Sequence, residues 1–230
     1  AANGTIHVLW RSYTTATGSA LKHSYLSGNS WTTQDVLRAS TGRPVLTFRR
    51  DTGAPIALWA RTVDGKGSLE LGNYLNSSWS RENTLSDFDL GVYGIPALTS
   101  LPGGNAVIAW TGKSSPTGYT AIYARAFKAT GGWQPVKHLD TGLSSGSLHP
   151  VLVSDKHGRV VLLWNFAHTQ VNYSSDGVTW SATKKPFGGY SYAPGLNSGL
   201  EHGIAMSHDG AAVAIWVNED NSRVETALTK

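Results

Sequence analysis

The sequence has no cysteine and few charged residues, and both features narrow the kinds of protein it can encode. With no cysteine among 230 residues, disulfides and thiolate metal sites are excluded. Charged residues make up 15% of the chain, and the net charge of +4 is spread without a basic stripe or run. We therefore expect no nucleic acid among its partners.

Long apolar runs are also missing. No stretch approaches the roughly 20 consecutive apolar residues that a membrane helix needs, so we expect no membrane span. No window keeps a helical apolar stripe either, and we expect almost no helix. A start at Ala1 and Ala2, in a chain rich in Trp, Ser and Thr, is typical of a mature secreted protein. We predict an extracellular location, although an expression boundary explains the start equally well.

Tryptophan is abundant, and its nine copies fall into two interleaved series. Five end short apolar runs about 50 residues apart: Trp10, Trp59, Trp110, Trp164 and Trp216. Four follow Gly-, Asn- or Ser-containing segments between them: Trp31, Trp79, Trp133 and Trp180. A third element precedes each member of the first series except Trp10: PVLTF, PALTS, PVLVS and GIAMS. The sequence is therefore an internal repeat.

Each repeat contains short runs rich in Val, Ile, Leu, Tyr and Trp, separated by Gly, Asn, Asp and Pro. Those lengths and breaks indicate strands joined by turns. Four antiparallel strands in about 50 residues are typical of a β-propeller blade. We predict an all-β fold: a β-propeller of about five four-stranded antiparallel blades in one domain over 1–230. The expected blade units are approximately 1–37, 44–85, 96–139, 150–186 and 203–230.

The first and last units are incomplete. The first lacks its innermost strand, and the last stops before its outermost strand. An unpaired sheet edge is a template for another strand. We therefore expect further residues of the same precursor, a protein partner or an oligomer contact to complete the open blade.

The segment Ser174–Trp180 reads SSDGVTW. It resembles a shortened Asp-box, the hairpin of sialidase-type propellers in which Asp caps the turn and Trp packs between blades. The tryptophan repeat also resembles propeller lectins that bind fucose or N-acetylglucosamine. The resemblance covers the whole chain but concerns architecture, because Asp-boxes are structural. It implies a propeller, and the lectins among its relatives imply glycan binding.

In propellers, ligands usually bind at the loops that lead from an outermost strand to the next innermost strand. Two such loops here combine aromatic and polar residues. Rings stack on sugar faces while polar groups hold hydroxyls, although packing between blades is the alternative role for any one Tyr. The loop candidates are Asp87, Asp89, Tyr93, Tyr190, Tyr192, Glu201 and His202.

Residues just before the innermost strands are expected to rim the axial opening. Arg43, His149 and His202 hold such positions. His149, His202 and Glu201 are chemically adequate metal ligands, but no close-spaced His pair supports a metal. We expect these residues to bind ligand or hydrogen-bond neighbouring backbone, with no metal and no cofactor.

We expect the two tryptophan series to differ in how deeply they are buried. The first series ends apolar strands and should be buried between blades. The second series lies on the outermost strands, where a ring could stand partly open to a sugar, although core packing is favoured by the general burial of large aromatics. Trp31, Trp79, Trp133 and Trp180 therefore join the ligand-binding candidates.

Three functions remain open on the sequence. Composition and repeat favour a secreted, lectin-like carbohydrate-binding propeller with shallow aromatic sites. The first alternative is a protein-interaction module of an extracellular assembly. The second is a glycoside hydrolase-like propeller, which needs two placed carboxylates. Asp87, Asp89, Asp140 and Glu201 could supply these, but spacing does not show that they converge, so an enzyme is the weaker expectation.

Overall fold

The chain folds into five antiparallel β-sheets that follow one another along the sequence. The computed structural model describes residues 4–14, 18–38, 42–63, 66–85, 96–113, 120–139, 149–166, 168–184, 202–218 and 223–229. Within these ranges the only helical element is a 3₁₀ turn, Pro102–Gly104. The prediction of an all-β fold of about five antiparallel units is confirmed.

The first two sheets differ by one strand. The first contains β1 (Ile6–Thr14), β2 (Gly18–Ser27) and β3 (Ser30–Arg38). The second contains β4 (Val45–Phe48), β5 (Pro55–Val63), β6 (Lys66–Leu75) and β7 (Ser78–Leu85). As predicted, no innermost strand equivalent to β4 of the second sheet joins the first sheet within the described ranges.

The third sheet has a divided outer edge. It contains β8 (Ala97–Ser100), β9 (Ala106–Lys113) and β10 (Thr120–Lys128), with the short strands β11 (Gly132–Trp133) and β12 (Lys137–His138) both paired to β10. The fourth contains β13 (Val151–Ser154), β14 (Val160–Phe166) and β15 (His168–Ser174). Its outer strand is reduced to two isolated bridges, Ser174 with Trp180 and Val171 with Lys184.

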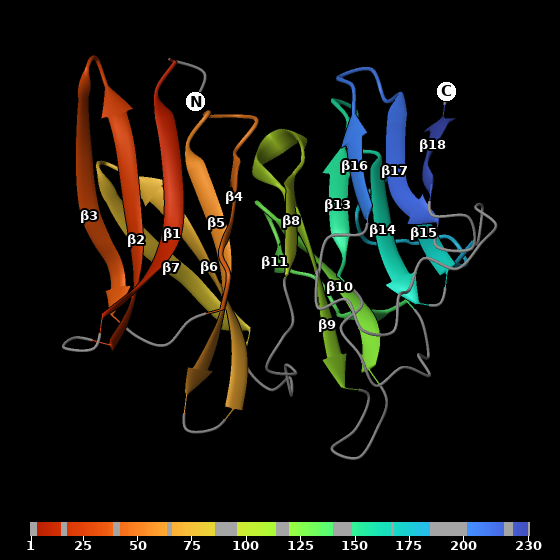
Figure 1. Cartoon of the computed structure of the whole chain (residues 1–230), viewed down its shortest axis with the longest axis horizontal. Coiled ribbons are helices and arrows are strands. Elements are labelled where there is room, and N and C mark those ends of the chain that lie inside the picture. The colour runs from red at the N-terminus through yellow and green to blue at the C-terminus, as the bar shows by residue number, and fades with distance from the viewer. Residues whose placement is uncertain are drawn as a thin grey trace.

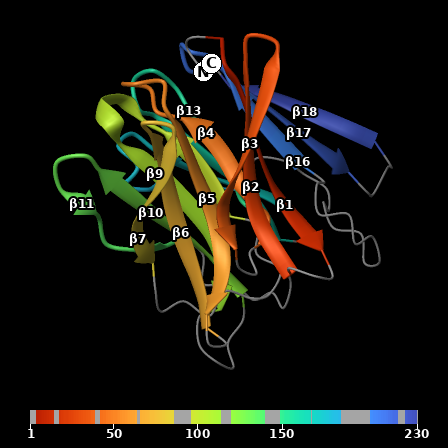
Figure 2. The same cartoon turned by 90° about the vertical axis from the view of Figure 1, so that its left-hand side faces the viewer.

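The fifth sheet contains β16 (His202–Met206), β17 (Ala212–Asn218) and β18 (Arg223–Thr229). In the described part of the chain no fourth strand joins it, as the repeat predicts. Figure 1 shows the first and fifth sheets at opposite ends of the long axis. Figure 2 shows both on one side of the molecule, with the second and third sheets on the other. The five sheets therefore follow a curve whose two ends are the first and fifth sheets.

Alternation along the strands buries both faces of the central sheets. In β5, Ala57 and Trp59 point toward the first sheet, whereas Ile56 and Leu58 lie on the opposite face. All four side chains are buried because a neighbouring sheet covers each face. The core is therefore a series of layers between sheets.

The Ser174–Trp180 hairpin is held by its own residues. The Asp176 carboxylate accepts from the backbone N–H groups of Val178 (2.8 Å) and Thr179 (2.7 Å), and Gly177 takes the positive φ of 76° that the turn requires. These hydrogen bonds cap the turn, so the Asp176 carboxylate has a structural role.

Candidate functional site

The innermost strands β4, β8, β13 and β16 begin at one end of the sheets. At their other ends the following turns are tied together. Arg50 donates to the backbone carbonyls of Ser100 (3.0 Å) and Ser154 (2.7 Å), and the Lys156 N–H donates to the His208 carbonyl (3.2 Å). Since those turns gather at one end, the starts of the strands gather at the other. We call the residues at these starts, Arg43, His149 and His202, the axial mouth.

His202 is the first residue of β16 and is 7% exposed. Neither of its ring nitrogens has a hydrogen-bond partner within the described part of the chain. Burial lowers the pKa of His202 to about 4; a contact between the ring and the His149 backbone, which does not meet hydrogen-bond geometry, opposes this shift, and the His149 ring adds to it. The ring is therefore neutral at pH 7. Buried polar atoms normally have partners, so these two nitrogens invite a ligand.

His149 lies beside His202 with an unusual backbone. Its φ is +40°, in the left-handed region that non-glycine residues rarely adopt, directly before Pro150. Its Nδ1 is buried and has no partner among the described residues. Burial lowers the pKa of His149, and the charge of Arg43 lowers it further. Such strain, of order 1–3 kcal/mol, is typical of functional positions.

The axial mouth thus combines two neutral imidazoles with one exposed guanidinium. Each imidazole can donate one hydrogen bond and accept one, and Arg43 can bind a carboxylate or hydroxyls. In the described ranges no group of three His, Asp or Glu side chains lies close enough to hold a metal ion. The geometry fits an uncharged polar ligand that makes several hydrogen bonds.

The remaining loop candidates lie outside the described residues: Asp87, Asp89, Tyr93, Tyr190, Tyr192 and Glu201. The same holds for Asp140. Along the chain, 86–95 joins β7 to β8, and Glu201 directly precedes His202. These residues therefore remain predictions from the sequence.

The second tryptophan series lies mostly between sheets. Trp79, Trp133 and Trp180 are partly buried and pack against three different core clusters. Arg125 lies over the Trp133 ring at 5.4 Å. Trp31 differs, with 54% of its surface exposed. In the described structure the first three pack as interface residues, and Trp31 alone stands open.

The first series is buried only in part. Trp59, Trp110 and Trp164 are at most 1% exposed, as predicted. Trp10 is only half-buried, so the prediction that it is a buried core residue is wrong. Its ring is exposed because no other sheet in the described part of the chain packs against that face of the first sheet.

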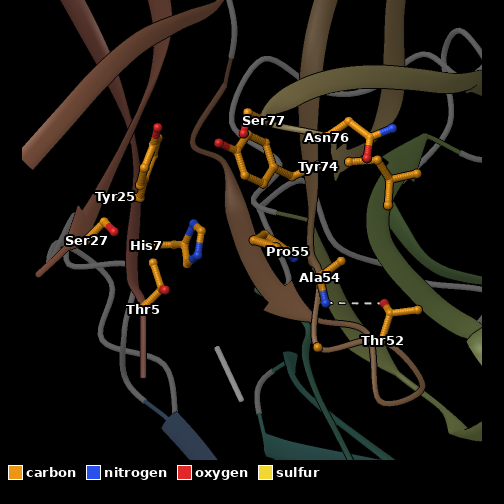
Figure 3. A pocket seen from close by; sticks show the side chains of 12 residues that line it. Thr5, His7, Tyr25, Ser27, Thr52, Ala54, Pro55, Tyr74, Asn76 and Ser77 are labelled. Carbon is orange, nitrogen blue, oxygen red and sulfur yellow. Dashed lines mark hydrogen bonds between the residues drawn. The ribbon is translucent and has the colours of Figure 1, made fainter. Parts of the chain in front are cut away.

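The structure also contains a groove between the first two sheets that the sequence did not predict. It has a volume of about 490 Å³ and lies at the turn end, opposite the axial mouth. Figure 3 shows His7 and Tyr25 of the first sheet facing Tyr74 and Ser77 of the second. None of the described residues that line it is Lys, Arg, Asp or Glu, so these walls are uncharged apart from any protonated histidine.

The His7 ring, which lines this groove, packs against the ring of His23. His7 Nδ1 lies 2.9 Å from His23 Nε2, and the two rings stack. His23 is fully buried, and its ring meets Tyr74 and Trp79 edge-on. Burial lowers the pKa of His23 to about 4, with His7 lowering it further. The alternation of side chains along β1 and β2 predicts that His7 and His23 share a face, but neither residue belongs to the tryptophan repeat.

The likeness of this chain to known proteins lies in its fold. No family profile and no curated protein sequence matches it. Its structure resembles the α-L-arabinofuranosidase Arb93A of Fusarium graminearum with a TM-score of 0.57 and 12% identity, over 99% of this chain and 72% of that one. The endo-arabinase of Bacteroides thetaiotaomicron matches with a TM-score of 0.50 and 10% identity, over 99% of this chain and 89% of that one. TolB of Acinetobacter baumannii matches with a TM-score of 0.54 and 14% identity, over 97% of this chain and 50% of that one.

These similarities correct the functional expectation. The resembled structures include several glycoside hydrolases, so they contradict the lectin-like function that the sequence favoured. They also give no support to the Asp-box lectin type in particular. The tryptophan content that suggested sugar stacking instead serves packing between sheets in the central part of the chain. At identities this low the likeness shows the fold alone, and the fold of this chain is that of a β-propeller.

Proposed function

We propose that this chain is a glycoside hydrolase-like propeller whose active site is the axial mouth. The observation that carries the proposal is the buried His202, whose ring nitrogens have no partner among the described residues, beside the strained His149 and the cationic Arg43. The likeness to an arabinofuranosidase and an endo-arabinase supports a glycan as the substrate class.

Glycoside cleavage needs a carboxylic acid to protonate the leaving oxygen and a carboxylate to act as base or nucleophile. The sequence offers Asp87, Asp89, Asp140 and Glu201 for these two roles. In our proposal, neutral His149 and His202 hydrogen-bond sugar hydroxyls and fix the ring. Arg43 stabilises the ionised carboxylate and keeps its pKa low.

The proposal is tested by assaying the purified chain on chromogenic α-L-arabinofuranosides and β-mannosides and on arabinan oligosaccharides. We expect turnover of at least one substrate. Among Asp87→Asn, Asp89→Asn, Asp140→Asn and Glu201→Gln, two variants should lose about 100-fold or more in kcat, because each removes an acid–base group. Asp209→Asn, on the exposed turn at the opposite end, serves as control and should keep full activity.

His202→Ala and His149→Ala test whether the axial mouth binds the substrate. Each should lower kcat/KM about tenfold or more, since a lost hydrogen bond to the substrate weakens the transition state. The exposed His208 gives the matched control, His208→Ala. No turnover across the panel, or two histidine variants as active as the control, would contradict the proposal.

A further inference from the structure

The two ends of the curved array expose apolar faces that are covered everywhere else. We define the back face of a sheet as the one toward the preceding sheet, and the front face as the one toward the following sheet. We infer that the back face of the first sheet docks against the front face of the fifth sheet of a second copy of this chain. This goes beyond the proposed function, because it concerns assembly and not the axial mouth.

Back faces follow one rule inside the molecule. Trp59, Trp110 and Trp164 all lie on back faces, where each packs against the preceding sheet and is at most 1% exposed. The second-series tryptophans Trp79, Trp133 and Trp180 pack into the same three interfaces. A back face of this repeat therefore presents two tryptophans to a preceding sheet.

The first sheet has such a back face, and no sheet among the described residues packs against it. Pairing aligns Ile6 with Leu26 and Leu26 with Trp31, so these side chains form one row across β1, β2 and β3. Val8 and the half-buried Trp10 follow along the same face of β1. Ile6, Val8 and Trp31 are 52%, 42% and 54% exposed. Trp10 and Trp31 thus hold the positions that are buried between sheets elsewhere.

Front faces follow a matching rule. The residues three and one before each first-series tryptophan lie on the front face, and in the second, third and fourth sheets they are at most 6% exposed. These pairs are Ile56 and Leu58, Val107 and Ala109, and Val161 and Leu163. In the fifth sheet the same positions are Val213 and Ile215, and they are 41% and 45% exposed. Leu228, paired with Val213 on that face, is 76% exposed.

The two exposed faces are compatible in charge. Among the described side chains, the front face of the fifth sheet carries no ionisable group: Ala205, Val213, Ile215, Val224, Thr226 and Leu228. On the back face of the first sheet, Lys22 and Asp35 neutralise each other at 2.9 Å. Among the described side chains of the two faces, docking therefore buries no unpaired charge.

A second copy is the occupant because one chain carries both halves of this interface. The two halves lie at opposite ends of the long axis (Figure 1), so each is offered to another molecule. The contact continues the series of four interfaces already present between successive sheets. It joins different patches on the two copies, so the assembly is head-to-tail.

The test is sedimentation velocity of the whole chain from about 1 µM to about 100 µM. We expect concentration-dependent dimers or larger head-to-tail species. Val8→Glu blocks the back face and Ile215→Glu blocks the front face, and each variant alone should be monomeric. Leu75→Glu is the matched control, since Leu75 is 46% exposed but is the last residue of β6 in the second sheet, and it should assemble like the original chain.

Mixing the two blocked variants provides the decisive measurement. Val8→Glu keeps its front face and Ile215→Glu keeps its back face, so the mixture should form one dimer and stop there. Tryptophan emission should shift to shorter wavelength as Trp10 and Trp31 become covered. A monomer at every concentration, a mixture that stays monomeric, or assembly that survives both substitutions would each overturn the inference.

Discussion

The central sheets and the terminal sheets are built from the same repeat but end in different environments. Trp110 in the third sheet is 1% exposed, whereas Trp10, its counterpart in the first, is half-buried. Likewise Leu163 in the fourth sheet is fully buried and Ile215 in the fifth is 45% exposed. The burial of a residue in this fold therefore depends on whether a neighbouring sheet exists, and not on its own strand.

The largest expected effect follows directly from that contrast. Trp110→Ala should lower the free energy of unfolding by about 3–5 kcal/mol, because it leaves a cavity between two sheets. Trp10→Ala should cost less than about 1.5 kcal/mol, since solvent already reaches the ring. Denaturant unfolding of both variants checks the prediction, and equal losses would show that the two sheets are equally packed.

Acid should loosen the first sheet before the central ones. The pKa of His23 is lowered from 6.5 to about 4 in the folded chain, so the unfolded chain takes up the proton more readily. Stability is then fully present above about pH 6.5 and falls as the pH drops toward 4, by up to about 3 kcal/mol. Tyr25, Tyr74, Trp79, Gln34 and His7 face this ring, and none of them is an acid that could balance its charge.

Hydrogen exchange at pH 7 and pH 4.5 measures this difference. Amides of β1–β3 should lose protection at the lower pH while those of β8–β10 keep theirs. His23→Gln should reduce the pH dependence of stability and leave the part that comes from His202, whose pKa is also lowered to about 4, and His208→Gln, on an exposed turn, should leave the whole dependence unchanged. A uniform loss across all sheets would place the acid-sensitive group elsewhere.

The smallest effect compares equivalent positions beside the first-series tryptophans. Glu70 accepts from Trp59 Nε1 at 3.0 Å and pairs with Arg61 at 3.0 Å in a buried setting. Glu70→Gln should cost about 1–2 kcal/mol, because Arg61 loses its counter-ion. Lys22 holds the same register opposite Trp10, but its ion pair with Asp35 is partly exposed, and Lys22→Gln should cost about 0–1 kcal/mol. Thermal melting of the two variants in low salt tests the order.

The candidate site was only partly accessible to sequence reasoning. Arg43, His149 and His202 were found because each immediately precedes an innermost strand, a position that can be read from the repeat. The strain at His149 and the buried nitrogens of His202 could not be found, since they depend on how three separate strand starts meet. The His7 and Tyr74 groove was missed because its two walls come from different repeats.

The sequence by itself determined the strands, their alternation, the five sheets and the incompleteness of the first and last. These features follow from local spacing, which fixes which side chains share a face. Only the tertiary structure decided that Trp59 is buried and Trp31 is not, that His149 and His202 meet, and that Val213 and Ile215 stay exposed. Burial and proximity depend on which faces of neighbouring sheets come together, and residues about 50 positions apart carry no local signal of that contact.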